Sequence, residues 1–196
     1  MRKSGLFLAV LLLLLAALPA VAKPTIVIDA GHGGHDRGGG PGQRIPEKPY
    51  TLDIAQRLNR ILRSAGYNTA MTRDGDYFVT LSGRCAVASR TRNAVFVSIH
   101  LNSGQREGAN GIETYYYSGK SAGLASAIHS RVLRAAGTED RHIRRRGFYV
   151  LRRTSCVSVL CELGFLTNRA ESNRLLTAAH RQKLAEAVAA GIEAKY

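Results

Sequence analysis

Residues 25–36 read TIVIDAGHGGHD, and this stretch indicates what kind of fold to expect. Its first part is a β-branched apolar run that ends at Asp29, which is typical of a buried strand. A loop must follow, because residues 31–49 contain seven glycines and three prolines. Loops of this length inside compact domains usually carry function.

The rest of the chain alternates between helical and strand patterns. Apolar residues recur at helical spacing between positions 52 and 62, and Gly66 is typical of a helix end. Further strands are predicted at 67–72, 94–99, 111–117, 148–151 and 157–161, and further helices at 81–92, 122–136, 169–177 and 180–193. This alternation predicts one α/β domain with a twisted, mainly parallel sheet and helices on both faces.

Residues 1–22 are organised like a secretory signal peptide. Arg2 and Lys3 precede an apolar run from position 6 to 18, and residues 20–22 read AVA, a small-residue cleavage pattern. We therefore predict cleavage after Ala22 and a mature domain at 23–196. An uncleaved anchor is the alternative, although the apolar run is short for a membrane span.

The composition is that of a basic globular protein. The chain has 28 Lys and Arg against 14 Asp and Glu, and loss of Arg2 and Lys3 with the leader lowers the formal net charge from +14 to +12. Such a chain favours acidic partners. A hydrophobic content of 45% excludes a disordered chain.

Six arginines form a basic stretch, and three cysteines lie scattered along the chain. The arginines are Arg141, Arg144, Arg145, Arg146, Arg152 and Arg153. They either bind carboxylates and phosphates or form a solvated face. Cys85, Cys156 and Cys161 are too few for a disulfide framework, and we interpret them as buried small hydrophobic residues.

Polar residues follow several predicted strands at the edge where α/β proteins collect functional groups. They are Asp29 and His32 after the first strand, His100 and Asn102 after the third, Glu162 at the end of the last, and His35, Asp36 and Glu47 in the long loop. Two imidazoles and one carboxylate make the ligand set of a catalytic zinc, and a second carboxylate could transfer protons. Taken singly, each histidine could instead be a hydrogen-bonded structural residue.

Taken together, the sequence motifs resemble those of the zinc-dependent N-acetylmuramoyl-L-alanine amidases. The motifs are IDAGHGGHD at 28–36, EK at 47–48 with LDIA at 52–55, TR at 72–73 with Asp76, Leu81 and Arg84, FVSIHLN at 96–102, GIETYY at 111–116 and ELGFLTN at 162–168. The resemblance covers essentially the whole chain after residue 22, and it implies that residues 23–196 form the catalytic domain.

The resemblance implies a reaction and a set of residues for it. These amidases hydrolyse the amide that joins the lactyl group of N-acetylmuramic acid to the first L-alanine of the peptidoglycan stem. Matched by motif, His32, Glu47 and His100 fall on the zinc ligands, and Glu162 falls on the catalytic glutamate that moves the proton. His35 is the rival first ligand.

The roles of two further residues near the predicted ligands remain open, and three positions depart from the family pattern. Asp29 and Asn102 either orient the imidazoles or cap strand ends and turns. Three departures stand out: Arg37 replaces the usual proline, prolines at 46 and 49 flank Glu47, and His142 replaces a common glycine.

Two rival functions remain open from sequence. One is a thiol amidase that uses Cys161 with His100. The other is a peptidoglycan-binding module with a degenerate site.

The resemblance also sets the expected partners and location. The partner is anionic peptidoglycan, with no nucleic acid and no stable membrane anchor. We expect no obligatory protein activator, because the apolar stripe of the predicted helix at 122–136 is needed to cover the sheet. The periplasm is the preferred location over the outside of a Gram-positive wall, since no wall-anchoring repeat or sorting tail is present.

Overall fold

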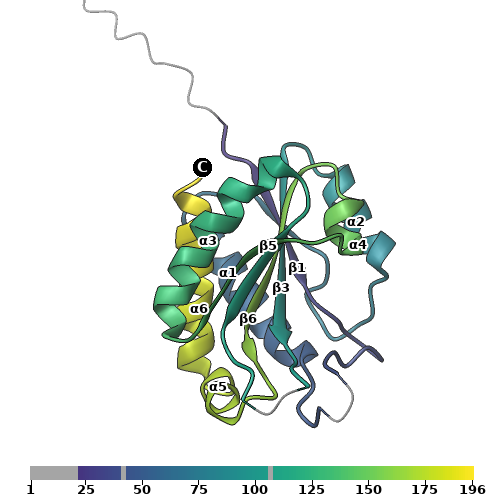
Figure 1. Ribbon diagram of the computed structural model, residues 1–196. Coiled ribbons are helices and arrows are strands. Elements are labelled where there is room, and N and C mark those ends of the chain that lie inside the picture. The colour runs from purple at the N-terminus through teal and green to yellow at the C-terminus, as the bar shows by residue number, and fades with distance from the viewer. Residues whose placement is uncertain (1–21, 41–42, 106–107) are drawn as a thin grey trace, which may run out of the picture.

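A computed structural model describes residues 22–40, 43–105 and 108–196, so the predicted signal peptide lies outside the described residues except for Ala22. A single six-stranded sheet runs through the centre, with helices on both faces (Figure 1). Its strands are β1 (Thr25–Ala30), β2 (Thr69–Met71), β3 (Ala94–Asn102), β4 (Ile112–Tyr116), β5 (Asp140–Arg145) and β6 (Val157–Phe165). The helices are α1 (Lys48–Ser64), α2 (Leu81–Arg90), the short 3₁₀ turn η1 (Gly119–Ser121), α3 (Ala122–Ala136), α4 (Tyr149–Arg152), α5 (Arg169–Leu175) and α6 (Ala178–Glu193).

The strand order is β2-β1-β3-β6-β4-β5. Strand β1 pairs in parallel with β2 and β3, and β3 pairs in parallel with β6. Strand β4 runs antiparallel to β6 and carries β5 in parallel at the edge. The prediction of one α/β domain with a mainly parallel sheet is confirmed, and the reversed pair at one edge is a feature that the sequence patterns did not indicate.

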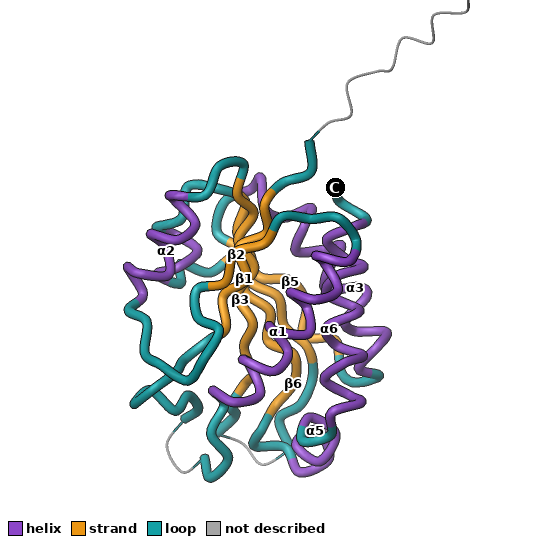
Figure 2. The backbone as a smooth tube through the Cα atoms, turned by 180° about the vertical axis from the view of Figure 1, so that it is seen from behind, coloured by secondary structure: helices purple, strands orange, loops and turns teal. Residues whose placement is uncertain are grey.

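The two faces of the sheet are covered to different depths. Helices α1, α3 and α6 lie together on one face, and α2 with the short α4 lies on the other (Figures 1 and 2). Because side chains alternate along a strand, Cys161 joins the larger core beneath α1, α3 and α6, whereas Leu160 packs on the side of α2 and α4. Glu162 shares the side of Leu160, so it faces the thinly covered side of the sheet.

Helix α3 is committed to the larger core. Its buried residues are Leu124, Ala125, Ile128, His129, Val132 and Ala136. It approaches α6 closely at Gly191, where an added Cβ would lie 2.5 Å from the backbone of Ile128. This position bears out the expectation that the helix at 122–136 covers the sheet.

Two elements differ from the sequence prediction. Residues 148–151 were expected to form a strand, but Tyr149–Arg152 is the helix α4. A short apolar run does not distinguish one helical turn from a strand, and here only Val150 and Leu151 are buried. Strand β5 escaped prediction because its sequence, DRHIRR, is mostly charged, a composition that suits the exposed edge of a sheet.

The cysteines are all free, and their burial differs. Cys85 and Cys161 are buried, which confirms the prediction for these two residues, whereas Cys156 is partly exposed. Burial raises the pKa of the Cys161 thiol to about 12. Within the described ranges, no helix has both the length and the apolar character to cross a bilayer.

Candidate metal centre and active site

His32 lies in a turn just after β1. Two buried arginines stabilise this turn by donating hydrogen bonds to its backbone carbonyl oxygens. The φ angle of His32 is +62°, in the left-handed region that residues other than glycine seldom adopt. Arg84 donates hydrogen bonds to the oxygens of Ala30 (2.6 Å) and His32 (2.7 Å), and Arg73 Nε donates to Ala30 at 2.9 Å. The Asp29 carboxylate accepts from Arg84 at 2.7 Å. Asp29 thus holds Arg84 in the position from which Arg84 stabilises the turn.

Glu47 is almost fully buried at the start of α1, where the long loop ends. Its backbone N–H donates to the Arg37 carbonyl at 2.8 Å, and its Oε1 accepts from the backbone N–H of Leu101 at 2.8 Å. The side chain is therefore tied both to its own loop and to β3. Pro49 falls in the first turn of α1, where a missing backbone N–H costs no helical hydrogen bond.

His100 lies on β3, and its ring packs directly against the backbone of Gly31. A Cβ atom at position 31 would lie 2.4 Å from the ring Cε1 of His100. Only glycine leaves room for the imidazole, which explains the glycine at the end of the first strand.

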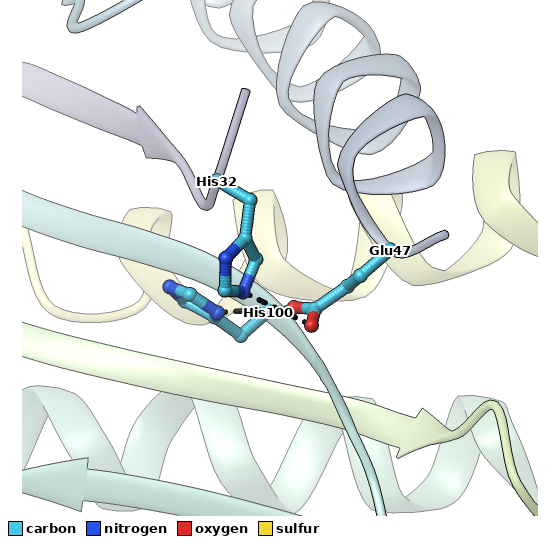
Figure 3. A group of neighbouring side chains, drawn as sticks. All are labelled: His32, Glu47 and His100. Carbon is cyan, nitrogen blue, oxygen red and sulfur yellow. Dashed lines mark hydrogen bonds and ion pairs between the residues drawn. The ribbon is translucent and has the colours of Figure 1, made fainter. Parts of the chain in front are cut away.

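The three side chains meet at one point (Figure 3). Glu47 Oε2 lies 3.0 Å from His32 Nε2, and Glu47 Oε1 lies 3.0 Å from His100 Nδ1. One ligand atom from each residue lies within 4.8 Å of the others. Two imidazole nitrogens and a carboxylate oxygen in this arrangement could hold a metal ion.

The charges of the cluster suit a cation. Burial raises the pKa of Glu47, but hydrogen bonds from His100 and His32 outweigh it and lower that pKa to about 2. Burial lowers the pKa of His100, but Glu47 outweighs this effect and raises that pKa to about 9. At neutral pH the carboxylate is therefore ionised and holds a proton on His100. Metal binding must displace this proton, so metal affinity falls as the pH falls.

Asp36 orients the first imidazole. Its Oδ2 lies 2.9 Å from His32 Nδ1. When a metal replaces the proton between His32 Nε2 and Glu47, this contact would keep the other proton on Nδ1. The sequence motifs place Asp36 in the long loop but indicate no role for it. The signal was its position four residues after His32 across a glycine-rich turn.

Glu162 faces the same cleft from β6, paired in register with His100 of β3. Its Oε2 is shielded from solvent and has no hydrogen-bond partner among the described residues. Burial raises the pKa of Glu162 and His100 lowers it, and with the nearby carboxylates Glu47 and Glu113 the net result is a pKa raised to about 8. The cleft has a volume of about 570 Å³ and is lined by His32, Glu47, His100 and Glu162 among others. A carboxyl of this kind can exchange protons at neutral pH.

Comparison with known proteins identifies the family and supports the fold. Residues 26–194 match the family model described as N-acetylmuramoyl-L-alanine amidase. The chain belongs to this family. The catalytic domain of the amidase CwlV from Bacillus (Paenibacillus) polymyxa var. colistinus superimposes with a TM-score of 0.84 at 36% identity, over 88% of this chain and 97% of that domain. AmiC2 of Nostoc punctiforme gives a TM-score of 0.83 at 40% identity, over 89% and 97%.

Curated relatives of this amidase differ in length. It is 39% identical to the uncharacterized Bacillus subtilis protein YqiI, over 98% of this chain and 96% of YqiI. It is 35% identical to the Bacillus subtilis amidase LytC, over 90% of this chain but only 36% of LytC. The chain therefore spans about a third of LytC. The predicted family, fold and peptidoglycan amidase function are confirmed.

Two alternatives from sequence receive clear answers in the amidase structure. His35 is exposed and stacks on Phe78 with ring centroids 4.2 Å apart, so His32 and not His35 joins the cluster. Cys161 is fully buried on the opposite side of the sheet from Glu162, and its raised pKa disfavours the thiolate. The thiol amidase hypothesis is therefore wrong.

Asp29 and Asn102 do not hydrogen-bond to the imidazoles. The Asp29 carboxylate accepts from Thr72 and Ser98, each at 2.6 Å, besides Arg84. Asn102 Nδ2 donates to Glu113 at 2.7 Å. Asp29 binds Arg84 and so stabilises the turn that carries His32, and Asn102 hydrogen-bonds to the carboxylate of Glu113.

The basic stretch divides into two parts. Arg141 Nε donates to the buried Glu113 at 3.2 Å, and Arg144 Nε lies 3.8 Å from the same carboxylate. The other four arginines are exposed, as the solvated-face interpretation expects. His142, in place of the usual glycine, adopts a φ of +71°.

We predict that Asp36→Ala weakens metal binding. Without the carboxylate, the His32 ring loses the partner that fixes its orientation and its tautomer. Loss of such an outer partner costs about 10- to 100-fold in metal affinity, measurable by competition with a chromogenic chelator. Glu186→Ala is the matched control, since it removes an exposed carboxylate from α6, away from the cleft. Equal affinity in the Asp36→Ala protein and the control would contradict the assignment.

Proposed function

We propose that this amidase is a zinc hydrolase that cleaves the amide between the lactyl group of N-acetylmuramic acid and the L-alanine of the stem peptide. The observation that carries the proposal is the meeting of the His32, Glu47 and His100 cluster with the unpartnered Glu162 in one cleft. This arrangement also argues against a degenerate binding module, because every group needed for hydrolysis faces the same space.

The donor set supports zinc as the metal. Two imidazole nitrogens and one carboxylate oxygen are a common ligand set of catalytic zinc, whereas calcium and magnesium prefer oxygen ligands. When bound, zinc supplies a Lewis acid that lowers the pKa of water toward about 7 and polarises a carbonyl group. The cleft beside the cluster leaves room for water and substrate.

The side chains of this chain would divide the remaining work. Glu162 accepts a proton from the attacking water and delivers it to the amide nitrogen as the C–N bond breaks, so one carboxyl acts first as base and then as acid. Its raised pKa and free Oε2 support this role. Asp36 holds the His32 ring, while Arg73 and Arg84 hold the turn that carries it.

Export fits this substrate, because peptidoglycan lies outside the cytoplasmic membrane. We propose that the signal sequence at 1–22 directs secretion, with the periplasm as the preferred location. The net charge of +12 after its removal would hold the protein on anionic wall material. We also propose that no activator is required, because α3 serves the core and is not available as a detachable plug.

The test is dye release from labelled sacculi by purified residues 23–196. We expect the zinc-loaded protein to release dye with no other protein present, to stop when a chelator removes the metal, and to recover when zinc returns. Absolute dependence on an added activator would contradict the open site. Failure of zinc to restore the chelated protein would contradict the metal assignment.

The same preparation tests the charge argument. Sacculus binding should weaken as NaCl rises toward about 0.5 M, because exposed charges are screened beyond a Debye length of about 8 Å at physiological ionic strength. Sedimentation with unlabelled sacculi measures the bound fraction. Binding that does not change with salt would contradict electrostatic retention.

A further inference from the structure

An apolar surface borders the candidate active site. Seven large hydrophobic side chains are exposed in the described part of the chain, and four of them line the cleft that contains the His32, Glu47 and His100 cluster. These four are Phe78, Leu81, Phe148 and Tyr149, between 38% and 54% exposed, and we call them the apolar wall. Exposed apolar groups that gather at one cleft usually mark a binding surface.

The apolar wall is built from two segments far apart in sequence. Phe78 and Leu81 lie at the entry to α2, and Phe148 and Tyr149 lie at the start of α4. Helices α2 and α4 lie side by side on the thinly covered face of the sheet (Figure 1). The fold therefore brings the two halves of the wall together beside the cluster.

The wall is fixed relative to the metal ligands. Arg84 Nε donates to the Val79 carbonyl at 3.1 Å, and the same guanidinium donates to the His32 carbonyl. On the other half, the Phe148 ring meets Tyr115 edge-on with centroids 5.0 Å apart. A group bound on the wall would therefore have a defined position relative to the reacting amide.

The charges that line the cleft suit one end of the substrate better than the other. The scissile amide joins a glycan on its acyl side to a stem peptide on its amine side, and the stem carries carboxylates. Arg84 is the one Lys or Arg among the described residues that line the cleft, and its guanidinium already donates to Asp29, Ala30, His32 and Val79. The cleft lining thus offers no free cation to a carboxylate. The exposed Arg153 guanidinium lies 6.0 Å from the centroid of the Tyr149 ring but does not line the cleft.

An N-acetylated sugar suits this surface better. A pyranose ring has a face of C–H groups, and the acetamido and lactyl groups add methyls, all of which can pack on aromatic rings. Aromatic side chains contribute large apolar contact areas, and Tyr149 keeps a hydroxyl for polar contact. Since the wall and Glu162 line one cleft, a sugar on the wall would remain next to the amide it carries.

We propose that the apolar wall binds the N-acetylmuramic acid end of the glycan, so that the stem peptide leaves the cluster away from α2 and α4. This inference rests on the proposed function, because it assumes that the cluster acts on the muramoyl amide. It assigns to the wall a carbohydrate ligand and sets the direction in which the substrate crosses the site.

The test separates sugar binding from turnover. Zinc-loaded residues 23–196 and the variants Phe78→Ala and Tyr149→Ala are titrated with a peptide-free disaccharide of N-acetylglucosamine and N-acetylmuramic acid, and separately with the free stem peptide. We expect each variant to bind the disaccharide about 10-fold more weakly and the stem peptide unchanged. With an intact muropeptide, KM should rise while kcat changes little. Leu176→Ala, which removes an exposed apolar side chain after α5, is the matched control.

The outcomes decide the proposal in either direction. Retained disaccharide binding in both variants would overturn it. Loss of stem-peptide binding, or of binding to anionic phospholipid vesicles, in place of sugar binding would assign the wall to another occupant and also overturn it. Failure of the proposed function would appear differently, as absent muropeptide hydrolysis by the unaltered protein, while the disaccharide titration still reports on the wall.

Discussion

We expect alanine at His32, Glu47 or His100 to abolish metal binding and amide hydrolysis together. Each residue supplies one of the three ligand atoms that converge within 4.8 Å, so removal of any one leaves two donors. A catalytic zinc needs three protein ligands to keep its geometry and one open position. We expect the metal content of each variant to fall from one equivalent to near zero after dialysis, measured by elemental analysis.

Two controls make this result specific. His35→Ala removes a histidine three residues from His32 whose ring stacks on Phe78 outside the cluster, so this protein should keep one equivalent of metal. Glu47→Gln preserves the shape of the buried side chain but removes its negative charge. We expect this variant to lose the metal as well. Full metal occupancy with normal turnover in any ligand variant would show that the residue is not a ligand.

Glu162→Gln should lower kcat by about 10² or more while the metal stays bound. Glutamine has the size of glutamate but cannot accept and release the proton that moves from water to the amide nitrogen. The mechanism does not use Glu162 as a ligand, so metal content should match the unaltered protein. The measurement is kcat on a defined muropeptide, with metal content determined on the same sample.

Glu113→Gln is the matched control for this prediction. Glu113 lies directly opposite Glu162 in the β4–β6 pairing, but its carboxylate accepts hydrogen bonds from Asn102, Tyr115 and Arg141. We expect its loss to change kcat by less than about 10-fold, below the usual range for a general acid–base group. Normal kcat in metal-loaded Glu162→Gln protein, or equal losses in both variants, would remove the proposed proton-transfer role.

The central strands were predictable from sequence because burial on both faces imposes continuous apolar runs. Strands β1, β3 and β6 were all found this way, although β6 extends to Phe165 and the prediction ended at Cys161. The edge strand β5 is not predicted because one row of its backbone groups faces solvent and none of its side chains is fully buried, which leaves a charged sequence without an apolar pattern.

The sequence by itself determined the family, the α/β fold and which histidines and glutamates to consider, because motif residues and apolar runs are local properties of the chain. The tertiary structure decided how they meet. In the folded chain His32 joins the cluster and His35 does not, and Asp36 contacts His32. Cys161 lies in the core, and Glu162 lies in the cleft. These outcomes depend on how the loop after β1 closes onto β3 and on which face of the sheet is thinly covered. Both are set by packing between segments far apart in the chain, which no local pattern records.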